Sequence, residues 1–322
     1  MFANTSLTTQ VRQSCESVIE HAHLLEIRDE GLDLLAEICK SEPTLVASPA
    51  ATPLLSSPEV ASDFAEGLAM RSLAANAINF GSGYHDLVRK LPGHSGARTM
   101  NVRLARYFDA TGAPDAKRLL GFTSEDCSQI FGQELDGGAL EELMGRFAQG
   151  LRDLGEFVTT HGGSARAVLD RCEQSAVALA EMLTSMPFYR DVEMMEGVSV
   201  SFYKRAQITP ADLAREGLWH FNDLHELTAF ADNLVPHVLR VDGVIVADPG
   251  LVEKIDRGTL LTPGSREEIE LRAAAVVAVE RLLQRIGAPK LRPMDLDAWL
   301  WSRGGGARYK AHPRPRSRSV FY

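Results

Sequence analysis

The sequence predicts a mainly helical protein, all-α with at most one short β-hairpin. Apolar residues recur at steps of three and four along most of the chain, which is the period of helices that bury one face. Alternation of apolar and polar residues, typical of a half-buried strand, is convincing only around residues 192–202. Capping residues and prolines mark the ends of several helical stretches.

The length and composition are those of a soluble globular protein. The chain has 322 residues, of which 45% are hydrophobic and 24% charged, and this length allows one large domain or two. We expect a single helical domain over residues 1–322. It could divide into an N-terminal subdomain over residues 1–150 and a C-terminal catalytic portion over residues 151–322.

The net charge of -9 argues against a partner such as a long nucleic acid, because proteins bind long nucleic acids by neutralising phosphates with Lys and Arg. A local group of cations can still hold one small phosphate. The N-terminus lacks a basic flank before an apolar stretch, and no run of about 18 apolar residues occurs. We therefore expect no membrane partner and a cytoplasmic location, while the oligomeric state stays open.

The cysteines are scattered and form no CxxC pair. This pattern predicts reduced, mostly buried thiols rather than a disulfide framework or a zinc site. The four are Cys15, Cys39, Cys127 and Cys172. We expect no metal and no cofactor.

In the N-terminal part, helices are expected over residues 29–40, followed by Pro43, and over residues 58–80, with Pro58 in the first turn. A glycine-rich segment follows and begins GSGY at residues 81–84. Backbone can approach a ligand closely at such a segment, so it is either a pocket wall or a plain surface connection. Its glycine spacing fits neither a Walker loop nor a Rossmann turn, because no strand-like run precedes it.

The central part is again helical. The spacing predicts helices over residues 101–159 and, after a Gly-Gly break, over residues 164–185. Residues 192–202 form the expected hairpin, with Glu-Gly at 196–197 as its turn. Thr-Pro at 209–210 has the form of a helix start, in which a capping hydroxyl precedes proline.

Two acids lie at the ends of predicted helical stretches. Asp223 opens a sequence similar to a capping box, so its simplest role is an N-cap worth roughly 1 kcal/mol. Asp232 differs, because Pro236 has no N–H to offer the carbonyl of residue 232 and a helix there should kink or stop. Asp232 is therefore either a catalytic carboxylate or one of the many acids found near helix ends.

The best-marked helix is expected over residues 266–286, with a Ser/Glu capping box at its start and Gly287 at its end. Glu270 and Arg272 are expected off its buried stripe, in an ion pair. The tail over residues 314–322 ends in apolar and aromatic side chains, so we expect it to dock on the protein.

Five ordered segments resemble the queuosine salvage proteins, a family of queuosine 5'-phosphate N-glycosylases. They are PFYRDV at 187–192, SFYKRAQ at 201–207, LTAFAD at 227–232, VPHVL at 235–239 and RSRSVFY at 316–322. The resemblance is close from about residue 155 onward and weaker before it. It implies an all-helical, DNA-glycosylase-like architecture and an enzyme that releases the 7-deazaguanine base queuine from a nucleotide, in connection with tRNA modification.

The sequence departs from the family pattern in three places. GSGY at 81–84 replaces an aromatic-rich run, Asn-Leu at 233–234 replaces Tyr-Arg, and Ser302 stands where another acid is common. We therefore expect one wall of the base pocket to be rebuilt. The resemblance supports the reaction class more firmly than the identity of the base.

The resemblance also implies roles for two acids. Cleavage of a nucleoside C–N bond develops positive charge on the ribose, so a carboxylate near the sugar can stabilise that charge and take a proton from water. Asp232 is expected in this catalytic role. Asp223 is expected to bind the base, because a guanine-like edge offers N–H donors to a carboxylate.

Further residues are expected to bind the rest of the nucleotide. Either Lys204 or Arg190 is expected to bind the 5'-phosphate. Phe202, Tyr203 and Trp299 are candidates to stack on the base and are equally compatible with positions in the core. Two other functions stay open: a hydrolase of the same class that acts on another nucleotide, and a non-catalytic helical protein that binds a nucleotide or nucleobase.

Overall fold

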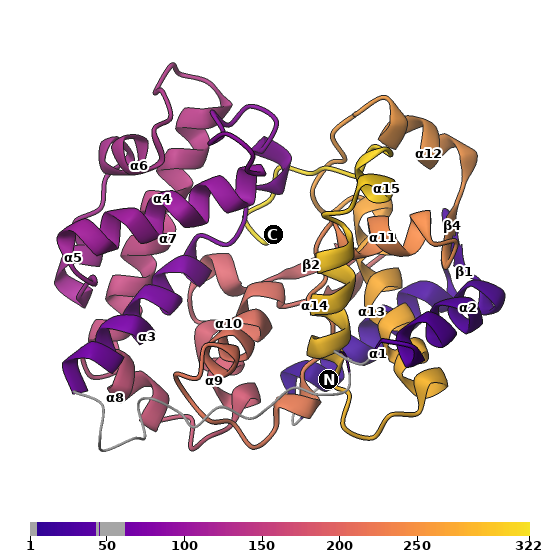
Figure 1. Ribbon diagram of the computed structural model, residues 1–322, viewed down its shortest axis with the longest axis horizontal. Helices are drawn as coiled ribbons and strands as arrows, with labels where there is room; N and C mark the ends of the chain where they lie inside the picture. The colour runs from indigo at the N-terminus through magenta and orange to yellow at the C-terminus, as the bar shows by residue number, and fades with distance from the viewer. Residues whose placement is uncertain (1–4, 43–44, 46–61) are drawn as a thin grey trace. The chain divides into compact units, whose positions relative to one another are not determined.

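The computed structural model of this protein describes residues 5–42, 45 and 62–322. These residues form fifteen α-helices and two antiparallel sheets of two strands each (Figure 1). The predicted mainly helical fold class is confirmed. The likeness to the DNA glycosylases stays a prediction.

The chain divides into two compact units, each assembled from separate parts of the sequence. The first comprises Met1–Ala50, Asp191–Gln207 and Asp223–Arg318, and the second comprises Ala51–Arg190, Ile208–Asn222 and Ser319–Tyr322. The expected single domain, with its division near residue 150, stays a prediction.

The first unit is built around a long central helix. Its helices are α1 (Leu7–Glu20), α2 (Asp29–Lys40), α11 (Val235–Val241), α12 (Pro249–Asp256), α13 (Arg266–Ile286), α14 (Pro293–Arg303) and α15 (Ala307–Lys310), and a 3-10 turn, η5, covers Leu224–Glu226. Helices α1, α2, α11 and α14 all pack against α13. The predicted helices over 29–40 and 266–286 are confirmed at both ends.

Helix α13 begins and ends where its caps predict. The Ser265 hydroxyl accepts a hydrogen bond from the N–H of Glu268, and Gly287 ends the helix in the left-handed conformation. The expectation that Glu270 and Arg272 lie off the buried stripe is wrong, because both are buried. Other elements surround the first half of α13. Glu270 pairs there with Arg266, and Arg272 pairs with Asp191.

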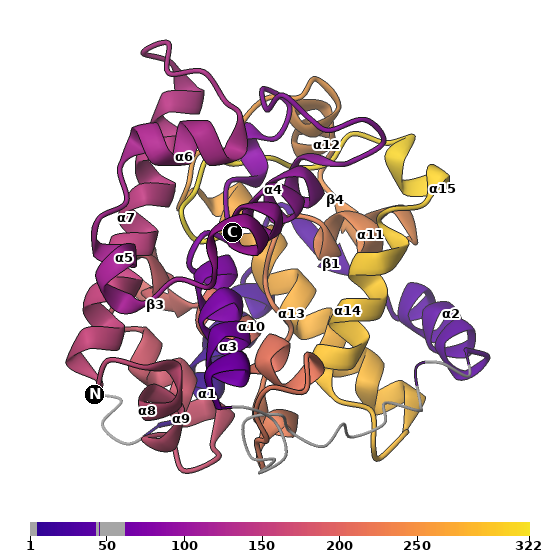
Figure 2. The same cartoon turned by 60° about the vertical axis from the view of Figure 1, so that its left-hand side comes forward.

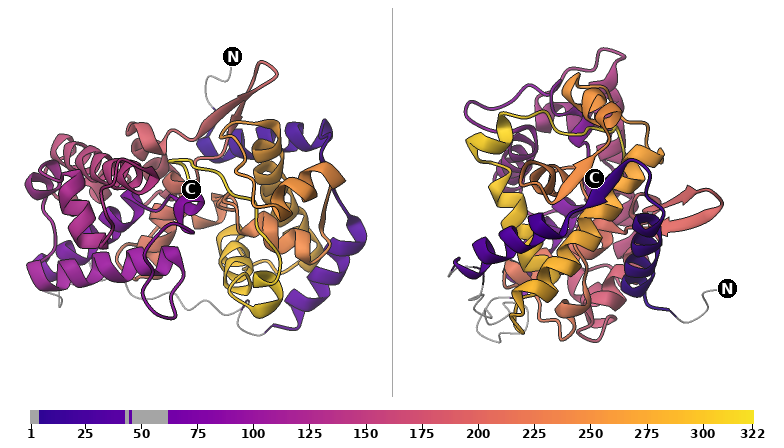
Figure 3. Two further views of the ribbon diagram at one scale, coloured as in Figure 1. Left: turned by 90° about the horizontal axis from the view of Figure 1, so that it is seen from above. Right: turned by 90° about the vertical axis from the view of Figure 1, so that its right-hand side faces the viewer.

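Two short sheets belong to the first unit. Strands β2 (Val192–Met195) and β3 (Val198–Ser201) form the predicted hairpin. Strand β3 packs against α1, and the turn end of the hairpin extends away from the helices (Figure 3). Its turn has Glu196 at φ 52° and Gly197 at φ 82°, the left-handed pair that matches the strand twist. The pairing of β1 (Leu25–Ile27) with β4 (Ile245–Ala247) was not predicted, because three residues are too few to show alternation.

The second unit contains most of the remaining helices. They are α3 (Ser62–Ala77), α4 (Gly96–Thr111), α5 (Ala116–Leu120), α6 (Ser124–Phe131), α7 (Ala139–Thr160), α8 (Ala165–Asp170) and α9 (Ala176–Leu183), with 3-10 turns η3 (Ser82–Tyr84) and η4 (Pro187–Tyr189). Helices α3 and α7 lie side by side (Figure 2). Gly150 permits this contact, since a Cβ there would lie 2.7 Å from the Ala77 carbonyl oxygen. The predicted first-turn position of Pro58 lies outside the described residues.

The helix predicted over residues 164–185 is instead two short helices, α8 and α9. Between them Glu173 and Gln174 adopt left-handed conformations, at φ 47° and 63°, which a right-handed helix cannot contain. The Ser175 hydroxyl then caps α9 by accepting a hydrogen bond from the N–H of Ala178.

Helix α10 (Lys204–Arg215) begins earlier than predicted and crosses from the first unit to the second. The predicted start at Thr209 and Pro210 is wrong, because Pro210 lies inside the helix. The Asp191 carboxylate accepts a hydrogen bond from the N–H of Lys204 at 3.0 Å. The cap therefore comes from a residue distant in sequence, which a local pattern cannot reveal.

The C-terminal tail docks as predicted. Tyr322 is buried, and its carbonyl oxygen accepts a hydrogen bond from the N–H of Gly81 at 3.0 Å. Gly81 has a φ of 98°, a conformation that favours glycine. Within the described part of the chain, no helix combines the length and the apolar character needed to cross a membrane.

Candidate active site

Asp232 lies in an irregular, buried stretch of the first unit between η5 and α11. The prediction that Pro236 interrupts a helix here is wrong. Helix α11 starts at Val235 and Pro236 occupies its first turn, where a missing N–H is tolerated. The acid therefore precedes a helix rather than lying at a break within one.

The stretch around Asp232 has no regular secondary structure, so side chains from other elements satisfy its backbone groups. The N–H of Thr228 donates to Oε1 of Gln207, and the N–H of Phe230 donates to Oδ1 of Asp297, both at 2.9 Å. The carbonyl of Ala231 accepts from Nε of Arg272, also at 2.9 Å. These bonds hold the backbone on the N-terminal side of Asp232.

Asp232 uses one of its two carboxylate oxygens to start α11. Oδ1 accepts hydrogen bonds from the N–H groups of Leu234 and Val235, at 2.8 and 2.9 Å. On the next residue, Asn233 donates its side-chain N–H to the Pro315 carbonyl at 2.9 Å. Among the described residues, Oδ2 of Asp232 has no hydrogen-bond partner, so this oxygen is available for chemistry.

The environment raises the pKa of Asp232 above its usual value. Burial is the largest cause and opposes the charged form, while the Val235 N–H, the Lys204 charge, the Leu234 N–H and the Arg314 charge lower the pKa to a smaller extent. A raised pKa makes the ionised form of a carboxylate a stronger proton acceptor. This property suits a general base.

The segment that carries Phe202, Tyr203 and Lys204 is held by one residue, Asp191. The Asp191 carbonyl accepts from the N–H groups of Phe202 and Tyr203, at 3.0 and 3.2 Å, and its carboxylate caps Lys204. Tyr203 is fixed in a left-handed conformation, with φ 50°. Such strain in a non-glycine residue is concentrated at functional sites.

Arg272 joins this segment to the stretch that carries Asp232. Its guanidinium binds both carboxylate oxygens of Asp191, contacts Glu268 and donates to the Ala231 carbonyl. It also lies 4.0 Å from the ring centroid of Phe202. Sequence reasoning missed the roles of Arg272 and Asp191, although Arg272 follows Ile269 by three residues and so falls on the buried stripe of α13.

The remaining predicted site residues of the first unit differ in how deeply they are buried. Phe202 is fully buried, Lys204 is 5% exposed, and Tyr203 and Asp223 are partly buried. Asp223 precedes η5, but its side chain does not cap that turn. The prediction of an N-cap at Asp223 is therefore wrong, and its role at the base stays a prediction.

Two further predicted residues are Trp299 and Arg190. Trp299, on α14, is partly buried against the core of the first unit, and the Arg303 guanidinium lies 4.5 Å from its ring centroid. Arg190 is an exposed residue of the second unit. Within the described ranges, no three His, Cys, Asp or Glu side chains gather as metal ligands.

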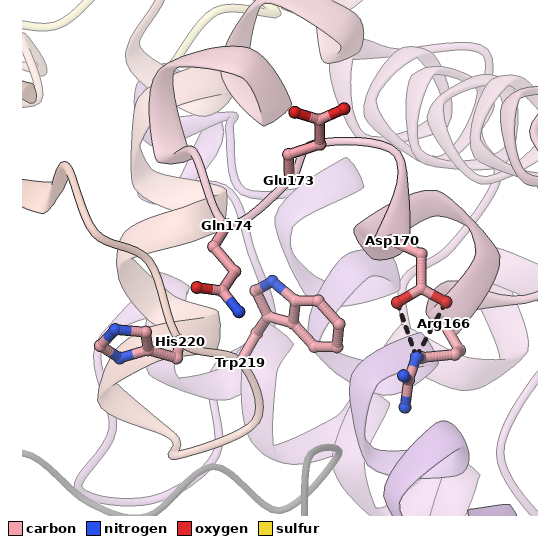
Figure 4. Close-up of a pocket in the computed structure, with 6 residues that line it drawn as sticks. All are labelled: Arg166, Asp170, Glu173, Gln174, Trp219 and His220. Carbon is pink, nitrogen blue, oxygen red and sulfur yellow. Dashed lines mark hydrogen bonds and ion pairs between the residues drawn. The ribbon is translucent and has the colours of Figure 1, made fainter.

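The second unit has a surface pocket of about 310 Å³ that contains none of the predicted site residues (Figure 4). It is lined by Arg166, Asp170, Glu173, Gln174, Trp219 and His220. Several of its polar groups bond to protein: Arg166 pairs with Asp170, and both Gln174 and His220 bond to Asn222. Trp219 is the buried wall, while the other lining residues are exposed.

A mainly helical protein with a partly buried carboxylate, on whose pKa two cations act, has components that a nucleotide hydrolase requires. The model of the queuosine salvage protein family matches residues 93–322. A queuosine 5'-phosphate N-glycosylase/hydrolase of Sphaerobacter thermophilus is 34% identical over 274 residues, which cover 81% of this chain and 83% of that protein. The chain belongs to the queuosine salvage protein family, so the resemblance is confirmed.

Eukaryotic relatives carry the same name. A queuosine 5'-phosphate N-glycosylase/hydrolase of Dictyostelium discoideum is 32% identical over 216 residues, which cover 65% of each chain. One of Bos taurus is 33% identical over 178 residues, which cover 50% of this chain and 52% of that protein. All five segments named above fall within the matched residues 93–322.

Proposed function

We propose that this protein is a hydrolase that cleaves the N-glycosidic bond of queuosine 5'-phosphate and releases queuine and ribose 5-phosphate. Membership of the family and the names of its relatives support the reaction. The observation that carries it is the Asp232 carboxylate, whose pKa is raised by burial and whose Oδ2 is free of hydrogen bonds among the described residues. We further propose that the enzyme acts in the cytoplasm and salvages a base used in tRNA modification.

In the proposed reaction Asp232 acts on the sugar and on water. The C1'–N bond breaks with its electrons leaving on the base, and positive charge develops on the ribose, which the nearby carboxylate stabilises. Water then bonds to C1' and gives a proton to Asp232, and the departing base takes up a proton from solvent. Asp232 returns its proton to solvent at the end of the cycle. One water is consumed and one nucleotide yields one base and one sugar phosphate, so the atoms balance.

Departure of a 7-deazapurine requires help at other positions, because its ring has carbon rather than nitrogen at position 7. We assign Asp223 to the guanine-like edge of the base, whose N–H groups are donors to a carboxylate. Tyr203 and Trp299 are the candidates to stack on the base, since both are partly buried. Phe202 is the weaker candidate, because the Arg272 guanidinium covers its ring.

For the 5'-phosphate, Lys204 is favoured over Arg190. Lys204 is almost completely buried, and its charge lowers the pKa of Asp232. Arg190 is exposed. A Lys ammonium binds phosphate as a point charge.

A second candidate function is hydrolysis of another nucleotide by the same chemistry. The segment at 81–84 favours this alternative, because it departs from the family pattern and forms the tight turn η3 at Gly81. A non-catalytic role in nucleotide binding is the third candidate. This role would leave Asp232 without a function as proton acceptor.

Incubation of the purified protein with queuosine 5'-phosphate and with the four common nucleoside monophosphates separates these functions. Chromatography would detect the released base. We expect release of queuine alone. Release of another base would favour the second function, and binding without release would favour the third.

A further inference from the structure

The C-terminal segment over residues 309–316 is bound through its main-chain carbonyls to the region of α11. Three side chains from residues 233–240 each donate a hydrogen bond to one carbonyl of this segment. They are Asn233 to Pro315, His237 to Tyr309 and Arg240 to Pro313, at 2.9, 2.9 and 2.8 Å. The stretch that begins directly after Asp232 is therefore tied to a segment about 80 residues further along the chain.

The end of the segment is also fastened to the loop that follows α12. The Arg316 carbonyl accepts a hydrogen bond from the Leu261 N–H at 2.8 Å, and the Arg316 side chain donates to the Gly258 carbonyl at 2.7 Å. The segment is therefore held on both sides of Pro315 by bonds that do not involve Asn233. The Pro315 carbonyl is in consequence a fixed point to which Asn233 can be anchored.

Asn233 carries the anchor that lies next to the proposed catalytic acid, and it is only 6% exposed. Oδ1 of Asp232 accepts hydrogen bonds from the N–H groups of Leu234 and Val235. The direction of the Asp232 carboxylate thus depends on where the backbone of these two residues lies. The bond from Asn233 fixes that backbone on the C-terminal side of Asp232, and the bonds described above fix it on the N-terminal side.

We propose that Asn233 is a positioning residue, which holds the Asp232 carboxylate in its working orientation by tying it to the C-terminal segment. This inference rests on the proposed function. Misplacement of a reacting group by about 1 Å costs about 100-fold in rate, so one buried hydrogen bond beside the acid can determine turnover. Asn233 belongs to one of the departures from the family pattern, where the usual tyrosine has no amide to make this bond.

A purely structural role for the Asn233 bond is the alternative. In that case its loss would lower the stability, and the folded protein that remained would turn over at the normal rate. Positioning instead predicts a lower kcat in fully folded protein. The acid limb of the pH profile should stay in place, because removal of a neutral amide leaves the charges that act on Asp232 unchanged.

The test measures kcat and KM for queuosine 5'-phosphate in the full chain, at urea-free conditions where denaturation curves show the variants to be folded. Asn233→Leu keeps a side chain of similar size without the donor, and Asn233→Ser is too short to reach the Pro315 carbonyl. For both we expect kcat to fall about 10- to 100-fold, with KM within about threefold and the acid limb unmoved. If Asn233→Leu does not fold, Asn233→Ser decides. A folded variant with the kcat of the wild type, or with a raised KM alone, would overturn the proposal.

The matched control is Gln133→Leu. Gln133 is a buried amide of the second unit that likewise donates to a main-chain carbonyl, that of Phe131, at 2.6 Å. Its loss should lower the urea midpoint and leave kcat unchanged, and an equal fall in kcat for Gln133→Leu and Asn233→Leu would also overturn the proposal. Wild-type turnover that persisted in the Asn233 variants would refute this inference alone, whereas a wild-type protein that released no base would refute the proposed function and this inference with it.

Discussion

The guanidinium of Arg272 holds the carboxylate of Asp191 through two parallel hydrogen bonds, 3.0 Å from Nη1 to Oδ1 and 2.6 Å from Nη2 to Oδ2. Both side chains are almost completely buried. The pair connects the segment that carries Lys204 to the backbone beside Asp232. It therefore positions the site without taking part in the proposed chemistry.

Removal of Arg272 should be strongly destabilising. Arg272→Met leaves the buried Asp191 charge uncompensated, so we expect the free energy of unfolding to fall by about 3–5 kcal/mol. Asp191→Asn in the same chain removes that charge and should recover part of the loss. Urea denaturation at pH 7 measures the free energy of unfolding of the single and double variants. If the loss in the double variant equalled the sum of the losses in the two single variants, the expectation would be contradicted.

The control for this prediction is Arg285→Met. Arg285 pairs with Asp29 and Asp33, whose side chains are exposed. Exposed pairs contribute roughly 0–1 kcal/mol, so this variant should stay close to the wild-type stability.

Asp232→Asn should abolish turnover and leave the affinity for the nucleotide within about tenfold. The asparagine keeps an oxygen for the N–H groups of Leu234 and Val235, so α11 should still form. Single-turnover release of base and equilibrium binding measure the two quantities. Asp33→Asn, at an exposed acid, is the control, and an active Asp232→Asn protein would remove the catalytic assignment.

The stability of Asp232→Asn gives a second readout. Because burial raises the pKa of Asp232, the native state binds its proton more tightly than the unfolded state does. The contribution of Asp232 to stability is therefore most favourable at low pH and is lost as the pH rises through the raised pKa. At neutral pH, Asp232→Asn should unfold at no lower urea concentration than the wild type.

Lys204→Met should shift the acid limb of the pH profile for kcat/KM to higher pH. The Lys204 charge lowers the pKa of Asp232, so its removal should raise that pKa further. The measured quantity is the apparent pKa of the acid limb rather than the rate. Lys254→Met, at an exposed lysine paired with Glu267, should leave the limb in place, and a shift of the Lys204→Met limb to lower pH would refute this account.

Asp297 should contribute to stability, because its carboxylate accepts a hydrogen bond from the Phe230 N–H at 2.9 Å. Asp297→Ala leaves this buried donor unsatisfied and should cost about 1–3 kcal/mol of unfolding free energy. Asp297→Asn keeps an acceptor oxygen and should cost less. Equal losses for the two variants, measured by thermal or urea unfolding, would mean that the hydrogen bond to Phe230 is not the reason for the effect.

Much of the fold follows from local patterns in the sequence. The three- and four-residue spacing of apolar side chains, the Ser265 cap and Gly287 predict α13 at both ends, and Glu196-Gly197 predicts the hairpin turn. Five short segments identify the family. A helix cap, a turn and the apolar face of a helix are each determined by residues close in sequence, so a local pattern can reveal them.

The tertiary structure decides the arrangement of the site. The Asp191 carboxylate caps the start of α10 from outside that helix, and it pairs with Arg272 in the core. A hydrogen bond from Asn233 to the Pro315 carbonyl ties the C-terminal segment to the residue after Asp232. Each partner is distant in sequence, and no periodic pattern records such a pairing. Burial then sets the pKa of Asp232, because desolvation depends on everything packed around the carboxylate and not on its neighbours in the chain.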